Sequence, residues 1–205
     1  MPGSQGEIVE FSIVADASPL IYFAKMDQLG FLHQVLGPVG ISPAVFRETV
    51  VAGQELGLKD AERIAAAIEA GSIVRISLSE DEARLAQSLQ QSDPRLGPGE
   101  CETIACAIHR RLKAILHDKK ARRMAVNHKA RTTQGIDILF LALLRGYVSL
   151  DGFKSLLREL ATLTGMDPAT LFEREALAEE ISARLELPPA DTGERDEDNE
   201  SDSPT

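Results

Sequence analysis

The stretch Ile13-Val-Ala-Asp16-Ala-Ser-Pro19-Leu decides the fold, because it reads as the end of a buried strand followed at once by a helix. The apolar residues of 9–15 predict the strand. Ser18 before Pro19 predicts the N-cap and first residue of a helix that runs to Met26. Further strands are predicted at residues 39–41, 73–76, 114–116 and, with a weaker signal, 129–132. Further helices are predicted at residues 29–36, from Ser42 and Pro43 onward, and at 59–70, 80–91, 99–111, 119–127, 136–145, 149–164 and 168–185. Strands separated by helices predict an α/β fold with a mostly parallel central sheet covered on both faces.

The composition is that of one folded domain. The chain has 205 residues, 43% of them apolar, which is enough for a substantial core. We expect this domain over residues 8–187, between a disordered N-terminus (1–7) and a disordered acidic tail (188–205). No apolar run is long enough to span a bilayer. Cys101 and Cys106 lie five apart in one predicted helix and cannot pair with each other, so a cytoplasmic protein is expected.

The net charge of −10 is distributed unevenly along the chain. Residues 188–205 contain seven acids against one arginine, a net charge of −6, which leaves −4 for the rest. Residues 110–131 contain nine lysines and arginines, and Asp118 is the single acid among them. Such charge runs are often solvated helix faces. The position of this basic run around the carboxylate of Asp118 favours a surface that binds a phosphate backbone.

Four acidic residues stand where predicted elements begin or end: Asp16, Glu48, Glu100 and Asp118. Asp16 and Asp118 follow predicted strands, whereas Glu48 and Glu100 lie in the opening turns of predicted helices. In a parallel α/β fold all these places belong to the sheet edge where ligands bind. Carboxylates that converge there make an oxygen-rich pocket suited to a hard divalent cation. The chain has no phosphate-binding P-loop, dinucleotide fingerprint or nucleophile elbow.

Each of these carboxylates also has a purely structural explanation. Asp16 could cap the following helix, although Ser18 is better placed to do so. Glu48 could be an ordinary surface residue, and Asp118 could close a turn beside its basic neighbours. Of the neighbours Glu100 and Glu102, one should face the pocket. Glu100 is the choice because it shares a helix side with the stripe expected to touch the sheet, formed by Thr103, Ile104, Ala107 and Ile108.

The order of these motifs resembles the PIN-domain family, in particular its VapC-like branch of predicted nucleic-acid-binding proteins. The matching segments are Asp16-Ala-Ser-Pro-Leu-Ile, Val45-Phe-Arg-Glu48, Gly99-Glu-Cys-Glu-Thr-Ile-Ala-Cys-Ala107, Leu116-His-Asp-Lys-Lys-Ala-Arg122, Thr133-Gln-Gly-Ile-Asp-Ile-Leu and Arg145-Gly-Tyr. The resemblance covers residues 9–147 and extends more loosely to 171. Each segment is weakly specific by itself, whereas their order is fairly specific.

The resemblance implies a PIN-like α/β/α sandwich with extra C-terminal helices and the activity of a Mg²⁺- or Mn²⁺-dependent endoribonuclease, often the toxin of a type II toxin–antitoxin pair. By position, the catalytic and metal-binding residues would be Asp16, Glu48, Glu100 and Asp118. The hydroxyl groups of Ser18 and Thr133 would lie next to them. His117 departs from the pattern, because that branch often has another acid there. This difference could change metal affinity or the response to pH.

The basic side chains after Asp118 are expected to hold nucleic acid by charge: Lys119, Lys120, Arg122 and Arg123. The alternative function is a catalytically inactive PIN-like scaffold that binds RNA or a protein through the same cationic edge. The expected partners are RNA, an antitoxin protein and a second copy of the chain in a homodimer. No membrane partner is expected.

Overall fold

A parallel sheet forms the centre of the computed structural model, which describes residues 11–186. Its strands are β1 (Ile13–Ala15), β2 (Val39–Ile41), β3 (Ile73–Arg75), β4 (Lys113–Ile115) and β5 (Arg131–Thr133). Their order is β3-β2-β1-β4-β5, and each neighbouring pair is parallel. The predicted parallel α/β fold is thus confirmed. The N-terminal residues 1–7, the start of the predicted first strand and the acidic tail lie outside the described residues.

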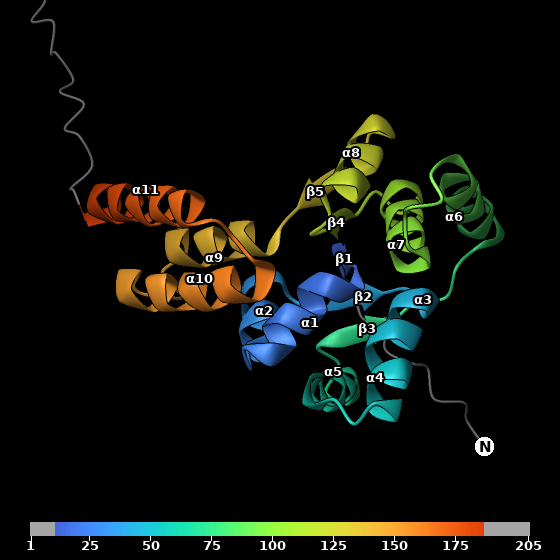
Figure 1. Ribbon diagram of the computed structural model, residues 1–205, viewed down its shortest axis with the longest axis horizontal. Helices are drawn as coiled ribbons and strands as arrows, with labels where there is room; N and C mark the ends of the chain where they lie inside the picture. Colours follow the sequence, from blue (N-terminus) through green and yellow to red (C-terminus); the bar gives the residue numbers. More distant parts are fainter. Residues whose placement is uncertain (1–10, 187–205) are drawn as a thin grey trace, which may run out of the picture.

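Helices cover both faces of the sheet, as Figure 1 shows. Those before β3 are α1 (Ala17–Lys25), α2 (Leu29–Leu36), α3 (Pro43–Phe46), the π-helical turn η1 (Arg47–Val51), α4 (Ala52–Glu55) and α5 (Lys59–Glu69). Then follow α6 (Glu80–Ser92), α7 (Pro98–His109), α8 (Lys119–Asn127), α9 (Gly135–Leu144), α10 (Leu150–Thr164) and α11 (Pro168–Glu186). The helix predicted after Ser42 is present and carries Glu48, and its hydrogen bonding changes from α to π at η1, which the sequence did not predict.

The alternation of side chains along the strands separates two apolar cores. On β1, Ile13 and Ala15 belong to one cluster, which also receives α1, α2, α5, α9 and α10. Val14 points to the other face and joins the cluster under α6, α7 and α8. Because apolar side chains on both faces are buried, the sheet sits in the middle of an α/β/α sandwich.

The C-terminal helices form a layer to one side of the sheet (Figure 1). Phe153 of α10 is fully buried and packs on Phe140 of α9, with ring centroids 4.8 Å apart. Ion pairs join α10 to α11: Lys154 with Glu179, and Arg158 Nε with Glu175 Oε1 at 2.7 Å. The extra C-terminal helices predicted from the sequence are therefore packed onto the domain.

The strand order creates a change of direction next to β1. The chain adds β2 and β3 on one side of β1 and then returns to add β4 and β5 on the other. Loops after β1 and β4 therefore diverge from the same edge of the sheet, at the carboxyl ends of these strands. Ligands of open parallel sheets bind at such a switch point. Asp16 directly follows β1, and Asp118 comes three residues after the end of β4.

Candidate active site

Asp16 occupies the N-cap position of α1, and its side chain is 5% exposed. The helix begins at Ala17, one residue before the predicted cap Ser18, so the prediction that Ser18 caps α1 is wrong. Ser18 lies inside the first turn. The Asp16 backbone N–H donates to Ile115 O at 3.1 Å, which holds the residue at the junction of β1 and β4. Its carboxylate makes no N-cap hydrogen bond, although the N–H groups of Ala17 and Ser18 act on it.

Burial raises the pKa of the Asp16 carboxyl from 3.8 to about 7. The backbone N–H groups of Ala17 and Ser18 oppose this shift, whereas the charges of Glu100 and Glu48 increase it. Removal from water disfavours the charged form, and so do nearby negative charges. Asp16 is therefore a carboxylate that is costly to ionise in the protein without a cation.

Glu48 comes from the π-helical turn η1, which follows the short helix α3. Ser42 caps α3 by accepting a hydrogen bond from Val45 N at 3.3 Å. Single π-helical turns inside helices are frequent at functional sites. The Glu48 side chain is exposed, yet partial burial raises the pKa of its carboxyl.

Gly99, in the first turn of α7, brings Asp16 and Glu48 together. A Cβ at this position would lie 3.1 Å from Asp16 Oδ1, 3.2 Å from Val45 Cγ2 and 3.4 Å from Glu48 Oε2. Both carboxylates thus border one point, and the missing side chain lets α7 approach them. The sequence reasoning did not identify Gly99 as part of the site. Its place between Pro98 and Glu100 was the available signal, since glycine in a helix often marks a close approach.

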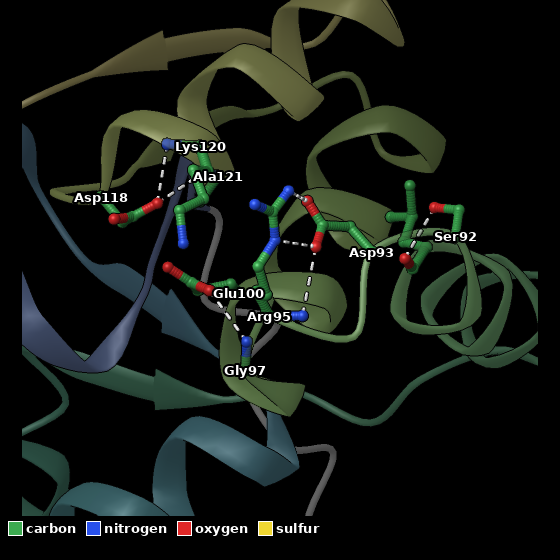
Figure 2. A network of polar contacts seen from close by, with 9 residues as sticks. Ser92, Asp93, Arg95, Gly97, Glu100, Asp118, Lys120 and Ala121 are labelled. Carbon is green, nitrogen blue, oxygen red and sulfur yellow. Dashed lines mark hydrogen bonds and ion pairs between the residues drawn. The ribbon is translucent and has the colours of Figure 1, made fainter.

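Glu100 stands one residue after Gly99 and accepts a hydrogen bond from Gly97 N through Oε2 at 2.9 Å. Burial raises the pKa of its carboxyl. The Gly97 N–H and the Lys120 charge oppose this effect, whereas Asp118 and Glu48 add to it. Figure 2 shows the Lys120 side chain pointing from α8 toward Glu100. The choice of Glu100 over Glu102 as the residue facing the site stays a prediction.

Asp118 is the N-cap of α8 and accepts hydrogen bonds through Oδ1 from Lys120 N at 2.7 Å and Ala121 N at 3.0 Å (Figure 2). Partial burial alone would raise the pKa of its carboxyl. These two N–H groups and the charges of Lys120 and Arg122 outweigh it, so the pKa lies below its ordinary value. Asp118 therefore remains ionised when Asp16 holds a proton, and its structural role as a cap does not engage Oδ2.

Four elements thus bring the four predicted carboxylates to one edge of the sheet, and the charges of Glu48, Glu100 and Asp118 act on one another or on Asp16. Among residues 11–186, no three His, Cys, Asp or Glu side chains lie close enough together to form a metal-binding group. Asp16 and Glu48 both border Gly99, and the charge of Glu100 raises the pKa of Asp16 more than the charge of Glu48 does. The acidic crevice is defined by these four carboxylates at the switch point of the sheet.

Two further acids near these elements fix the chain by hydrogen bonds. Glu102 was expected to point outward or to lie behind the metal ligands, whereas no role was predicted for Asp137. Glu102 accepts a hydrogen bond from Ala44 N at 2.7 Å and lies 3.7 Å from Arg47, so it holds α3 against α7. Asp137 accepts hydrogen bonds from Gln134 N at 2.8 Å and Thr133 Oγ1 at 3.3 Å. Thr133 is the last residue of β5, one residue beyond the strand predicted at 129–132, and its hydroxyl group donates to Asp137.

Three of the four basic side chains after Asp118 are exposed on α8: Lys119, Lys120 and Arg123. Arg122 differs, because its guanidinium group donates to His117 O and lies 3.5 Å from Leu116 O. It fastens α8 to the end of β4 and is less available to a ligand. His117 points to the Tyr22 ring, with centroids 5.1 Å apart. Burial and the Arg122 charge lower the pKa of its imidazole, against the opposing effect of Asp118.

An acidic crevice at the switch point of a parallel sheet, bordered by a cationic helix, defines a nuclease-type α/β protein. The family model described as a PIN domain matches residues 12–173. The chain belongs to the PIN-domain family, whose members are generally nucleases and generally use divalent metal ions. No curated protein matches the chain. Within the described residues, no helix is both long and apolar enough to cross a membrane.

Proposed function

We propose that this PIN-domain protein is a Mg²⁺- or Mn²⁺-dependent endoribonuclease that cleaves phosphodiester bonds in RNA, and that it acts as the toxin of a type II toxin–antitoxin pair. The observation that carries the proposal is the burial of Asp16 at the end of β1, with Glu48 and Glu100 raising the pKa of its carboxyl further. A buried acid beside other acids is unfavourable unless a cation offsets the charge. Perturbed carboxylates of this kind cluster at functional sites.

The donor set fits a hard divalent ion. Mg²⁺ takes one or two protein carboxylates and completes its shell with waters and substrate phosphate oxygens. Asp16 and Glu48, which border Gly99 from two sides, supply such a pair. Glu100 and Asp118 complete the proposed acidic quartet, and each has one carboxylate oxygen that accepts none of the hydrogen bonds described above. A bound ion would supply an activated water and balance charge on the phosphate.

The residues around the quartet have separate tasks in this proposal. Glu102 and Gly99 hold α3 and α7 together, which keeps Glu48 against Asp16. Lys120 lies over Glu100 and offsets part of the negative charge that would repel a polyanion. Lys119 and Arg123 are exposed on the same helix and would pair with phosphates of the strand. The crevice thus combines an acidic centre with a cationic border.

The test is cleavage of a labelled single-stranded RNA by the purified full-length protein. We expect cleavage with Mg²⁺ or Mn²⁺, none with a chelator, and none by Asp16→Asn with metal. Asp151→Asn is the matched control, because Asp151 is an exposed acid on α10. Cleavage that survives both chelation and Asp16→Asn would refute the proposed site. The toxin role requires in addition that expression of the wild-type protein, and not of Asp16→Asn, arrests growth.

The second candidate is the inactive scaffold that binds RNA or protein. It is favoured by the absence of a preformed group of three metal-ligating side chains within residues 11–186. Calorimetric titration with Mn²⁺ separates the two candidates. A nuclease should give a heat of binding that Asp16→Asn removes, whereas a scaffold should give no such difference.

A further inference from the structure

A hollow lies beside the acidic crevice, at the carboxyl ends of β4 and β5. Its walls include Tyr22 of α1, His117 after β4 and Gln134 before α9. Its floor includes Phe23 and Leu160, both buried. The hollow adjoins the crevice through the chain itself, because His117 precedes Asp118 and Gln134 follows Thr133. It has no part in the proposed cleavage chemistry.

The interior of this hollow has the size of one flat ring. Its volume is about 50 Å³. A cavity needs roughly 10–15 Å³ of this volume to hold one water, so the hollow has room for about four waters. Each water occupies about 30 Å³ in the liquid. This is the room of a single heterocycle and is too small for a heterocycle with its sugar. A ligand would insert one ring and leave the rest of its structure at the mouth.

The lining suits an aromatic ring that carries polar edge groups. Tyr22 and His117 offer two aromatic rings, arranged edge to face at an angle of 82°. The N–H group of Asp137 in α9 donates to the backbone oxygen of Gln134 and not to its side chain, so the amide can both donate and accept. The Thr164 hydroxyl group, by contrast, donates a hydrogen bond to Leu160 O at 2.9 Å.

A neighbouring surface depression carries two arginines and one acid. Its lining includes Arg122, Arg123, Thr133, Gln134 and Asp137, so Gln134 borders both the depression and the hollow. Arg122 is held by backbone carbonyl groups, which leaves Arg123 as the cation for a phosphate. Arg123 is exposed there. An aromatic hollow with a cationic border is the combination by which proteins hold single-stranded nucleic acid.

We propose that this hollow binds one base of the RNA strand adjacent to the cleaved phosphate, stacked on one of the two perpendicular rings of Tyr22 and His117 and in edge contact with the other, with Gln134 recognising the edge of the base. The inference rests on the proposed function, because it names a substrate contact beside the same crevice. It makes the protein selective for the base at one position, with discrimination coming from the amide of Gln134. An aromatic side chain of a protein partner is the competing occupant.

The experiment measures RNA binding by the full-length protein without cleavage. Short fluorescent single-stranded RNAs, each with one abasic nucleotide at a successive position, are titrated by anisotropy in chelator and low salt. Removal of one particular base should weaken binding about tenfold, whereas removal of the others should matter little. In His117→Ala and Gln134→Ala the intact RNA should bind about tenfold more weakly, and the effect of that one abasic position should disappear.

Two matched controls should bind RNA as the wild type does. Gln91→Ala removes an exposed glutamine of α6, and Tyr147→Phe changes an exposed tyrosine remote from the hollow. Tyr22→Ala is a further variant of the hollow. If it does not fold, Tyr22→Phe takes its place, because phenylalanine keeps the aromatic ring. Equal loss at all abasic positions, or an abasic effect that persists in both hollow variants, would overturn the proposal. RNA binding unaffected by the variants would instead assign the hollow to a protein side chain.

The outcome also separates this inference from the nuclease proposal. A protein that shows the base dependence but cleaves no RNA with Mg²⁺ or Mn²⁺ would retain the base site and lose the nuclease function. A protein that cleaves RNA with no dependence on Gln134 would retain the function and lose the base site. Absence of any RNA binding would overturn both.

Discussion

The buried carboxyl group of Asp16 should make the stability of the metal-free protein depend on pH. Its pKa is raised to about 7 in the folded protein from 3.8, so the folded protein binds this proton more tightly than the unfolded chain does. Its contribution to the free energy of unfolding is therefore complete below pH 3.8 and is lost as the pH rises to about 7. At ~1.4 kcal/mol per pKa unit, the loss is about 4 kcal/mol. Urea denaturation in chelator between pH 4 and pH 8 measures it.

Asp16→Asn should remove this pH dependence, because the amide does not ionise. At pH 8 without metal, the variant should be more stable than the wild type by a few kcal/mol, although it should cleave no RNA. Asp151→Asn, the exposed control, should keep the wild-type slope. A variant that retains the loss of stability between pH 4 and pH 8 would show that another group titrates.

Gly99→Ala should reduce cleavage while the protein remains folded. Gly99 is helical, so alanine would favour the helix by up to ~1 kcal/mol. Its Cβ would meet Asp16 Oδ1 at 3.1 Å and Val45 Cγ2 at 3.2 Å, so these side chains must shift by a few tenths of an ångström, and it would touch Glu48 Oε2 at 3.4 Å. Displacements approaching 1 Å cost about 100-fold in rate. We therefore expect at least a tenfold loss in kcat/KM with little change in the melting temperature.

Gly30→Ala is the matched control for this substitution, since nothing lies within 4 Å of a Cβ at Gly30 in helix α2. It should leave kcat/KM unchanged. If Gly99→Ala cleaves RNA as fast as Gly30→Ala does, the close approach of α7 to Asp16 and Glu48 does not matter for the chemistry.

At the level of elements, α6 and α7 are joined by an ion pair that should be important for stability. Arg110 Nε lies 2.6 Å from Glu82 Oε1, and the Glu82 side chain is 2% exposed. The hydrogen bond from Arg110 lowers the pKa of Glu82 against the effect of burial, so this stabilisation is present above pH 4.5 and is lost as the pH falls through the folded pKa. Because Arg110 is 31% exposed, Arg110→Ala should cost roughly 2–3 kcal/mol, less than the ~3–5 of a fully buried pair.

Chemical denaturation at pH 7 measures this difference, with Arg84→Ala as the control. Arg84 pairs with Asp81 and Glu80 on the exposed side of α6, with 68% of its side chain accessible. Its removal should change the free energy of unfolding by no more than ~0.5 kcal/mol. Similar losses in the free energy of unfolding for the two variants would show that the burial of Glu82 does not make its ion pair more important for stability.

Local sequence signals predicted most elements. Gly71 was expected just after the helix that ends near residue 70, and it has the positive φ of +74° that such a position needs. Ser42 caps α3 as expected. The cap of α1 was misplaced because Ser-Pro is the stronger local pattern, whereas the hydrogen bond from Asp16 N to Ile115 O fixes where that strand ends. This contact joins residues far apart in the chain and is invisible in a local pattern.

The same limit applies to the candidate site. The four carboxylates could be selected from the sequence because each stands at the end of an element, and parallel sheets bring such ends together. The π-helical turn that carries Glu48 has no signature in the apolar pattern, and Glu102 meets Ala44 across 58 residues. Sequence spacing thus identifies which residues share an edge, but tertiary packing determines how close they come.

For the whole molecule, the distribution of charge should decide how tightly RNA binds. The net charge is −10, and residues 188–205 carry −6 of it, although they lie outside the part of the chain that the structure describes. The tail acids should compete with RNA for the cations of α8, which include Lys119 and Lys120. Deletion of residues 188–205 should therefore raise RNA affinity severalfold at low salt. The gain should shrink above ~0.1 M salt, where charges farther apart than about 10 Å are screened.

A tail of equal length with every Asp and Glu replaced by Asn and Gln separates charge from bulk. If charge is the cause, this variant should bind RNA as tightly as the deletion does, and both should show the same dependence on salt. Anisotropy titrations at 25 mM and 200 mM salt give the comparison. The proposed metal-dependent cleavage of RNA should remain in all three proteins, because the acidic quartet lies within residues 16–118. Equal affinities of wild type and deletion at 25 mM salt would exclude the tail as a competitor, since screening is weakest there.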